Sequence, residues 1–97
     1  MSAEIEETMK RLQGQKGVVG VLIMDAEGRP ISSSLDQQSS NQHAQLLQEL
    51  AEKASRVVKE LEPADELTFL RLRSKKHEIM IAPDKDYYLV VIQNPQN

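Results

Sequence analysis

The stretch RLRSKKHEIMIAPDKDYYLVVIQ, from Arg71 to Gln93, decides the fold. Its last part, Tyr87–Gln93, is apolar at successive positions, which is typical of a strand buried on both faces. His77–Ala82 is a shorter strand with an apolar middle. Lys75–Lys76 and Pro83–Asp86 have the composition of hairpin turns. The basic residues that open the stretch therefore lie at a strand end and in a turn, where solvent is expected. This position favours a solvated turn over a nucleic-acid site.

Three more strands are predicted upstream. Glu66–Ser74 alternates imperfectly, with Arg71 and Arg73 on one face. Gly17–Asp25 is apolar at successive positions and is predicted to be buried on both faces. Pro30–Ser34 is a short return strand, and because Pro30 has no amide hydrogen this strand belongs at a sheet edge.

The sequence predicts a short helix and a long one. Ser2 caps the short helix and Gly14 ends it. The long helix runs from about Ser40 to Leu61, where Ser39 and Gln42 resemble a capping box and Pro63 ends the pattern. The apolar face of the long helix spans roughly 160°, whereas about 100° is enough to cover one sheet. This helix therefore has apolar surface to spare.

The element order α-β-β-α-β-β-β predicts an α+β fold. The two strands that are apolar on both faces are expected at the centre, each with its hairpin partner outside it. This gives a five-stranded antiparallel sheet of order 2-1-5-4-3 with a helix on each face. One edge, Leu67–Arg73, has neither a proline nor a bulge signal. A bare edge beside spare helix surface predicts pairing with a second copy of the chain.

Two sets of residues are candidates for contacts with other chains. The predicted dimer interface comprises apolar positions of the long helix and the bare edge: Leu46, Leu50, Ala54, Val57, Leu67, Thr68, Phe69, Leu70, Arg71 and Leu72. The short helix has one narrow apolar stripe and covers only part of its sheet face. Its stripe residues Ile5, Met9 and Leu12 are therefore expected to border a groove for a partner helix.

Composition argues against several other classes of function. The chain has 97 residues, no cysteine and a net charge of −3, with one phenylalanine and two tyrosines. These values disfavour thiolate metal sites, phosphate-backbone binding and base stacking. His43 and His77 are isolated, Asp84 and Asp86 are interpreted as turn formers, and no phosphate-binding glycine motif is present. We expect a soluble, cytosolic protein that is not an enzyme, with no catalytic residue, metal or cofactor and no membrane insertion.

The segments LTFLRLRSKKHEIMIAPDKDYYLVVIQNP and EETMKRLQGQKGVVGVLIMDAEGRPI closely resemble the roadblock family of cytoplasmic dynein light chains. The resemblance covers nearly the whole chain and implies one profilin-like domain over residues 1–97. It implies a homodimer in which the third strands pair into a ten-stranded sheet and the second helices pack together. It also implies a non-catalytic light chain that binds the dynein intermediate chain. The expected location is then the cytoplasm and the microtubule cytoskeleton, with indirect links to the dynein heavy chain and to microtubule-based transport.

Two alternatives remain at this point. Relatives that share the roadblock fold serve as regulators or scaffolds of small GTPases, so the resemblance also admits that function. The other is nucleic-acid binding through Arg71, Arg73, Lys75 and Lys76, which predicts that binding is lost steeply as salt rises. The net negative charge of the chain disfavours it.

Overall fold

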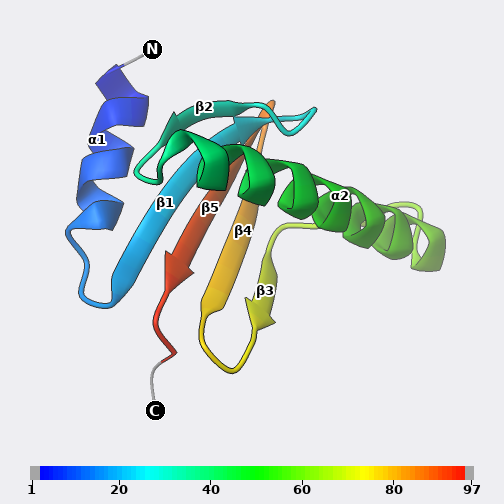
Figure 1. The fold of residues 1–97 in the computed structure, drawn as a ribbon. Coiled ribbons are helices and arrows are strands. Elements are labelled where there is room, and N and C mark those ends of the chain that lie inside the picture. Colours follow the sequence, from blue (N-terminus) through cyan, green and yellow to red (C-terminus); the bar gives the residue numbers. More distant parts are fainter. Residues whose placement is uncertain (1–2, 96–97) are drawn as a thin grey trace.

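A single antiparallel sheet of five strands carries one helix on each of its faces (Figure 1). The computed structural model describes residues 3–95. Its elements in chain order are α1 (Ala3–Gln13), β1 (Val18–Asp25), β2 (Pro30–Ser33), α2 (Gln37–Leu61), β3 (Leu70–Arg73), β4 (Glu78–Asp84) and β5 (Tyr87–Gln93). The predicted capping of α1 by Ser2 lies outside the described residues.

The strand order is β2-β1-β5-β4-β3, which confirms the predicted topology. The two strands with continuous apolar runs, β1 and β5, lie side by side at the centre, and Leu22 pairs with Val90 there. Every neighbouring pair is antiparallel. A central strand has side chains packed on both faces, so its sequence shows no alternation.

Alternate side chains of the central strands point to two separate cores. On the α2 face, Leu22 and Met24 of β1 pack with residues of β4, β5 and α2, including Leu47. On the α1 face, Val21 and Ile23 pack with Met9 of α1. This division follows the two-residue period of a strand. The α2 core is the larger of the two and contains Leu22, Met24, Ala44, Leu47, Ala51, Ile81, Val90 and Ile92.

Strand β3 is shorter than the predicted strand Glu66–Ser74, because it begins only at Leu70. Leu70 pairs with Ile81, so extending this register by two residues would place Thr68 opposite Pro83. A proline nitrogen has no hydrogen to donate and limits pairing at that position. Leu67, Thr68 and Phe69 therefore precede the strand in this structure instead of belonging to it.

Helix α2 begins earlier than predicted. Its N-cap is Asp36, whose carboxylate accepts a hydrogen bond from the Ser39 amide at 2.8 Å. The predicted cap, Ser39, lies inside the first turn and donates from its hydroxyl to Asp36 at 3.2 Å. Both residue types are good N-caps, and the earlier one satisfies the first free amides of the helix.

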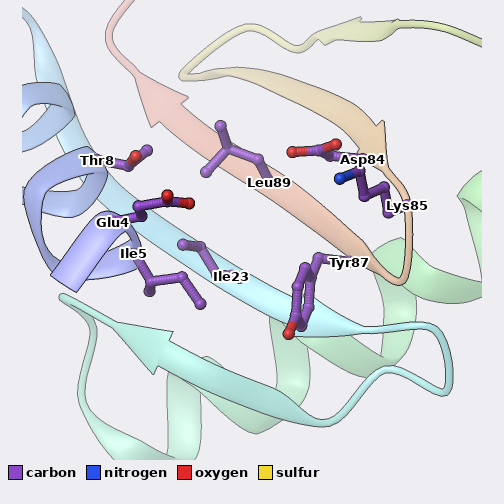
Figure 2. A pocket seen from close by; sticks show the side chains of 8 residues that line it. All are labelled: Glu4, Ile5, Thr8, Ile23, Asp84, Lys85, Tyr87 and Leu89. Carbon is purple, nitrogen blue, oxygen red and sulfur yellow. The ribbon is translucent and has the colours of Figure 1, made fainter. Parts of the chain in front are cut away.

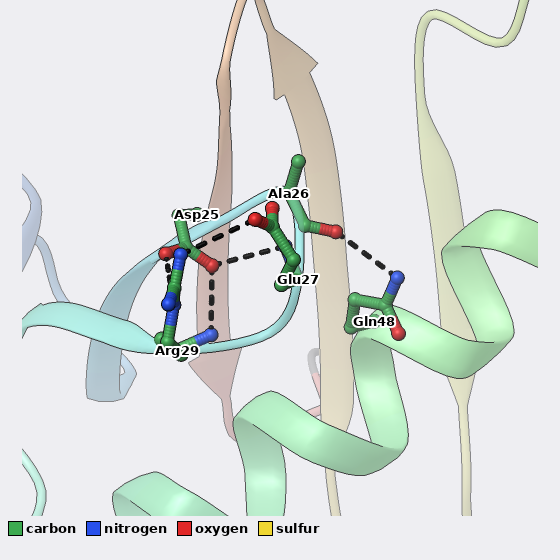
Figure 3. A network of polar contacts seen from close by, with 5 residues as sticks. All are labelled: Asp25, Ala26, Glu27, Arg29 and Gln48. Carbon is green, nitrogen blue, oxygen red and sulfur yellow. Dashed lines mark hydrogen bonds and ion pairs between the residues drawn. The ribbon is translucent and has the colours of Figure 1, made fainter.

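The β1–β2 turn is held against α2 by a polar network (Figure 3). Asp25 accepts hydrogen bonds from the Arg29 amide at 2.9 Å and the Arg29 Nε at 2.7 Å. Gln48 of α2 donates to the carbonyl of Ala26 at 3.0 Å. The Arg29 amide, together with the Arg29 guanidinium, lowers the pKa of the Asp25 carboxyl below its ordinary value. The network fixes which flank of α2 faces this turn.

Candidate functional site

The α1 face of the sheet is only partly covered. Helix α1 packs on β1 and β2, while β5, β4 and β3 extend beyond it (Figure 1). Met9 is 6% exposed and belongs to the core beneath the helix. Of the three stripe residues, Ile5 and Leu12 line hollows beside the helix and Met9 lies underneath it, and the binding of a partner helix there stays a prediction.

One hollow, of about 360 Å³, lies between the first turns of α1 and the β4–β5 turn (Figure 2). Its apolar lining includes Ile5, Ile23 and Leu89, and Glu4, Asp84 and Lys85 add charge. Lys85 has a φ of 55°, a left-handed conformation that costs a non-glycine residue roughly 1–2 kcal/mol. The turn of Asp84–Asp86 thus forms part of the rim of this hollow as well as closing the hairpin.

A second hollow, of about 240 Å³, lies at the other end of α1. It is lined by Leu12, Gln15, Phe69, Met80, Ala82, Leu89, Val91 and Gln93. Leu89 lines both hollows, so the two lie next to each other beside α1. We call this pair of hollows the α1 groove. Its floor is mainly apolar with charged groups at one end, a composition that suits the apolar stripe of a peptide or helix.

The second surface combines one flank of α2 with the free edge of β3. Since Gln48 faces the β1–β2 turn, Leu46, Leu50 and Val57 fall on the opposite flank at 100° per residue. All three are exposed, Leu46 at 57%. Of the other predicted interface residues, Thr68, Phe69, Arg71 and Leu72 are exposed, and Ala54, Leu67 and Leu70 are half-buried. Leu61, which was not predicted for this surface, is 81% exposed on the same flank.

The second half of α2 and the free edge of β3 lie on the same side of the molecule (Figure 1). The second half of α2 extends past β3 instead of lying over the sheet (Figure 1). Scattered exposed apolar residues are normal on a protein surface, but a contiguous set indicates an interaction site. We call this set the edge surface: Leu46, Leu50, Val57, Leu61 and Leu72 with strand β3.

A buried carboxylate lies under the basic residues of β3. The side chain of Glu78 is 4% exposed and pairs with Arg71 Nε at 2.5 Å. Gln93 donates to its other oxygen at 2.9 Å. The hydrogen bond from Arg71, and then that from Gln93, lower the pKa of Glu78 below its ordinary value. This contact was not predicted from the sequence, because the hairpin register places Arg73 opposite Glu78, and Arg71 reaches Glu78 diagonally from its place opposite Met80.

The remaining candidate residues are in ordinary surroundings. His43 Nδ1 lies 2.8 Å from the Ser39 carbonyl, one turn earlier in α2, and His77 is exposed after the β3–β4 turn. No group of three or more His, Cys, Asp or Glu side chains that could hold a metal ion occurs within residues 3–95. Neither helix of this part of the chain has the length and apolarity needed to cross a membrane. The predicted absence of enzyme activity stays a prediction.

The described residues thus define a small α+β domain, an antiparallel sheet between two unequal helices, with the two hollows of the α1 groove on the α1 face. The Roadblock/LC7 domain family matches residues 4–94. The chain belongs to this family.

Several solved bacterial structures are similar to the chain. A Roadblock/LC7 domain from Streptomyces avermitilis gives a TM-score of 0.81 at 12% identity, with 91% of this chain and 73% of that one covered. The gliding protein MglB from Thermus thermophilus gives a TM-score of 0.81 at 14% identity, with 97% of this chain and 76% of that one covered. MglB from Myxococcus xanthus gives a TM-score of 0.80 at 20% identity, with 95% of this chain and 76% of that one covered. At these identities the similarity shows the fold.

These comparisons correct the predicted identity as a dynein light chain. The similar structures are bacterial MglB and roadblock proteins, and bacteria have no microtubule cytoskeleton. The predicted intermediate-chain partner, the link to the heavy chain, the microtubule-associated location and the transport function are wrong for the same reason. The residues behind the resemblance largely build the fold that these bacterial structures share, so they identify the domain and not the complex in which it works.

Proposed function

We propose that this chain is a non-catalytic regulator or scaffold of a small GTPase and that it works as a homodimer. The observation that carries the proposal is the family match over residues 4–94 together with the shared fold of the bacterial MglB structures. The sequence alone already indicated this function as the alternative to a dynein subunit. One of the MglB structures has a tetrameric arrangement, so self-association occurs among proteins of this fold.

The homodimer uses the edge surface. Pairing of the β3 edges would satisfy the free backbone groups of that edge and join two sheets of five strands. The exposed flank of α2, with Leu46, Leu50 and Val57, would then pack against its twin. A two-fold interface places the same patch of both subunits in contact, which suits a self-complementary apolar stripe.

The α1 groove is the proposed contact for the GTPase or for a scaffolded segment. It lies on the sheet face opposite α2, so it stays open when two α2 helices pack together. Each dimer would present two such grooves on one continuous sheet face. A partner that engages both benefits from a raised effective concentration.

This function is tested by measuring the binding of the chain to purified small GTPases of the Ras superfamily from the same cell. Each GTPase is loaded with GDP or with a non-hydrolysable GTP analogue. We expect nucleotide-dependent binding of at least one of them by biolayer interferometry. Thr8→Arg introduces a long cation at the rim of the larger hollow and should abolish the binding. The matched control Asn41→Arg adds the same charge on an exposed position of α2 and should leave it intact. Absence of binding across the panel would contradict the proposal.

A further inference from the structure

Charge is divided sharply where β3 begins. Residues 60–69, ELEPADELTF, contain four carboxylates and no lysine or arginine. Residues 70–77, LRLRSKKH, contain four basic side chains and no aspartate or glutamate. The charged members of the two segments are Glu60, Glu62, Asp65 and Glu66 on one side and Arg71, Arg73, Lys75 and Lys76 on the other. The boundary falls at Leu70, the first residue of β3.

The two segments lie at opposite ends of an unpaired strand edge. Strand β3 is the last strand of the sheet in the described residues. The acidic segment returns from the far end of α2 and enters β3 from beyond the sheet, whereas the basic segment forms the β3–β4 turn at the other end (Figure 1). All eight charged residues are exposed. The strand edge therefore has a negative end and a positive end.

Contacts within the chain leave this polarity in place. The Asp65 carboxylate accepts from the adjacent Glu66 amide at 2.8 Å, and Glu62 accepts from the Ala64 amide at 3.3 Å. Arg71 is balanced by the buried Glu78, which reduces its share of the positive charge. The charge of Arg73 also acts on the Glu78 carboxylate, and Lys75 and Lys76 in the exposed turn carry the other two positive charges of this end.

We propose that this charge division selects a second copy of the chain, in antiparallel orientation, as the partner of the β3 edge. The inference rests on the proposed homodimer and specifies its orientation and its choice of partner. In an antiparallel pair, the start of one β3 lies beside the end of the other, so the acidic segment of each copy meets the Lys75–Lys76 turn of its twin. The two-fold axis repeats the contact at both ends.

A parallel pair or an unrelated strand would not gain these contacts. Parallel pairing would place acidic segment beside acidic segment and turn beside turn, which is repulsive at both ends. A foreign strand could form backbone hydrogen bonds with the edge, but it would match the charges only if it carried the same division. Complementary charge across an interface contributes orientation and partner choice more than raw affinity.

Two double variants test the proposal on the full chain. The first, Asp65→Lys with Glu66→Lys, places two lysines where they would meet the Lys75–Lys76 turn of the twin, and the second, Lys75→Glu with Lys76→Glu, places two glutamates where they would meet Asp65 and Glu66 of the twin. All four positions are exposed and lie outside helices and strands. We expect each variant alone to dimerise about tenfold more weakly than the native chain, because two attractive contacts become repulsive. When the two variants are mixed in equal amounts, heterodimers should make up well over the half of all dimers that random pairing gives.

Analytical ultracentrifugation gives the dissociation constants, and native mass spectrometry gives the proportion of heterodimer. The control, Asn41→Asp with Gln45→Glu, adds two charges on exposed positions of α2 and should keep the native dissociation constant. The effect of the swaps should shrink as salt rises, because exposed charges are screened. A native chain that sediments as a monomer would overturn the homodimer itself. A dimeric native chain with unaltered swap variants and a statistical mixture would overturn the charge proposal alone.

Discussion

Gly28 is the residue where the β1–β2 turn comes closest to α2. Its φ is +84°, and a Cβ atom there would lie 2.9 Å from Gln48 Cβ and 3.2 Å from the Ala44 carbonyl. The substitution Gly28→Ala should lower the free energy of unfolding by about 1–3 kcal/mol, since both the backbone and the contact are strained. Urea denaturation measures this change.

Gly14 provides the matched control for Gly28. A Cβ at Gly14 would meet its nearest atom at 3.5 Å, an ordinary contact. Gly14→Ala should therefore change the free energy of unfolding much less than Gly28→Ala. Equal losses for the two variants would show that the turn does not depend on the close approach to α2.

Glu78 makes stability depend on pH. Its folded pKa is lowered, first by the hydrogen bond from Arg71, so folding favours the ionised carboxylate. The stabilisation is present above the unfolded pKa, near 4.5, and is lost as the pH falls through the lower folded value. Urea midpoints of the native chain should therefore fall more steeply below this pH than those of Glu78→Gln. Asp25, whose pKa is also lowered, contributes equally to both proteins. Parallel profiles would rule out Glu78 as a source of the pH dependence.

At the scale of single elements, two residues, Asp36 and Ser39, are candidates for the N-cap of α2. Asp36→Ala removes the acceptor of the Ser39 amide and should lower the free energy of unfolding by about 0.5–2 kcal/mol. Ser39→Ala removes only a hydroxyl donor to Asp36 and should cost less. Thermal unfolding followed by circular dichroism ranks the two variants. The reverse ranking would restore Ser39 as the principal cap.

The sheet order could be predicted because β1 and β5 are apolar at successive positions, which indicates burial on both faces. Strands that are apolar on both faces must be central, and hairpin turns then place β2 and β4 beside them. The ends of elements were harder to predict. Asp36 and Ser39 are both good caps, and the choice between them depends on tertiary packing. The start of β3 depends on the strand opposite, where Pro83 limits the ladder.

The candidate surfaces could be predicted only in part. The narrow stripe of α1 indicated that the sheet would be incompletely covered, and hollows lined by Ile5 and Leu12 lie beside the helix, whereas their use by a partner stays a prediction. The stripe alone could not show that Met9, its middle residue, would be buried against Val21 and Ile23. The excess apolar width of α2 indicated an exposed flank, and the contact of Gln48 with the β1–β2 turn shows which flank that is.

At the scale of the whole molecule, the edge surface gives a test of self-association. Native protein should sediment at twice the 11.0 kDa mass of one chain at micromolar concentration. Val57→Glu would place an unpaired carboxylate within the α2–α2 contact and should raise the dissociation constant at least about a hundredfold. Asn41→Glu adds the same charge to an exposed position on the opposite side of α2 and should have no effect. If both variants remain dimeric, α2 does not form the interface.

The identity of the complex lies beyond what the strand residues determine. The sequence from Leu67 to Pro95 builds the third, fourth and fifth strands of a sheet that the bacterial MglB structures share at 20% identity or less. Residues selected for packing a common sheet indicate the family. They do not specify which larger assembly the domain joins, which is why the family was predicted correctly and the motor complex was not.

The second half of α2, which extends past β3 with Leu61 exposed, has one more consequence. In the proposed homodimer this flank is covered only by another copy, so the stability of the helix should follow mass action and the melting temperature should rise with chain concentration. Newly made chains at low abundance would spend longer with this half of α2 exposed to proteases. The cell could then adjust the lifetime of the protein through its rate of synthesis alone, because scarce chains would be degraded faster than abundant ones.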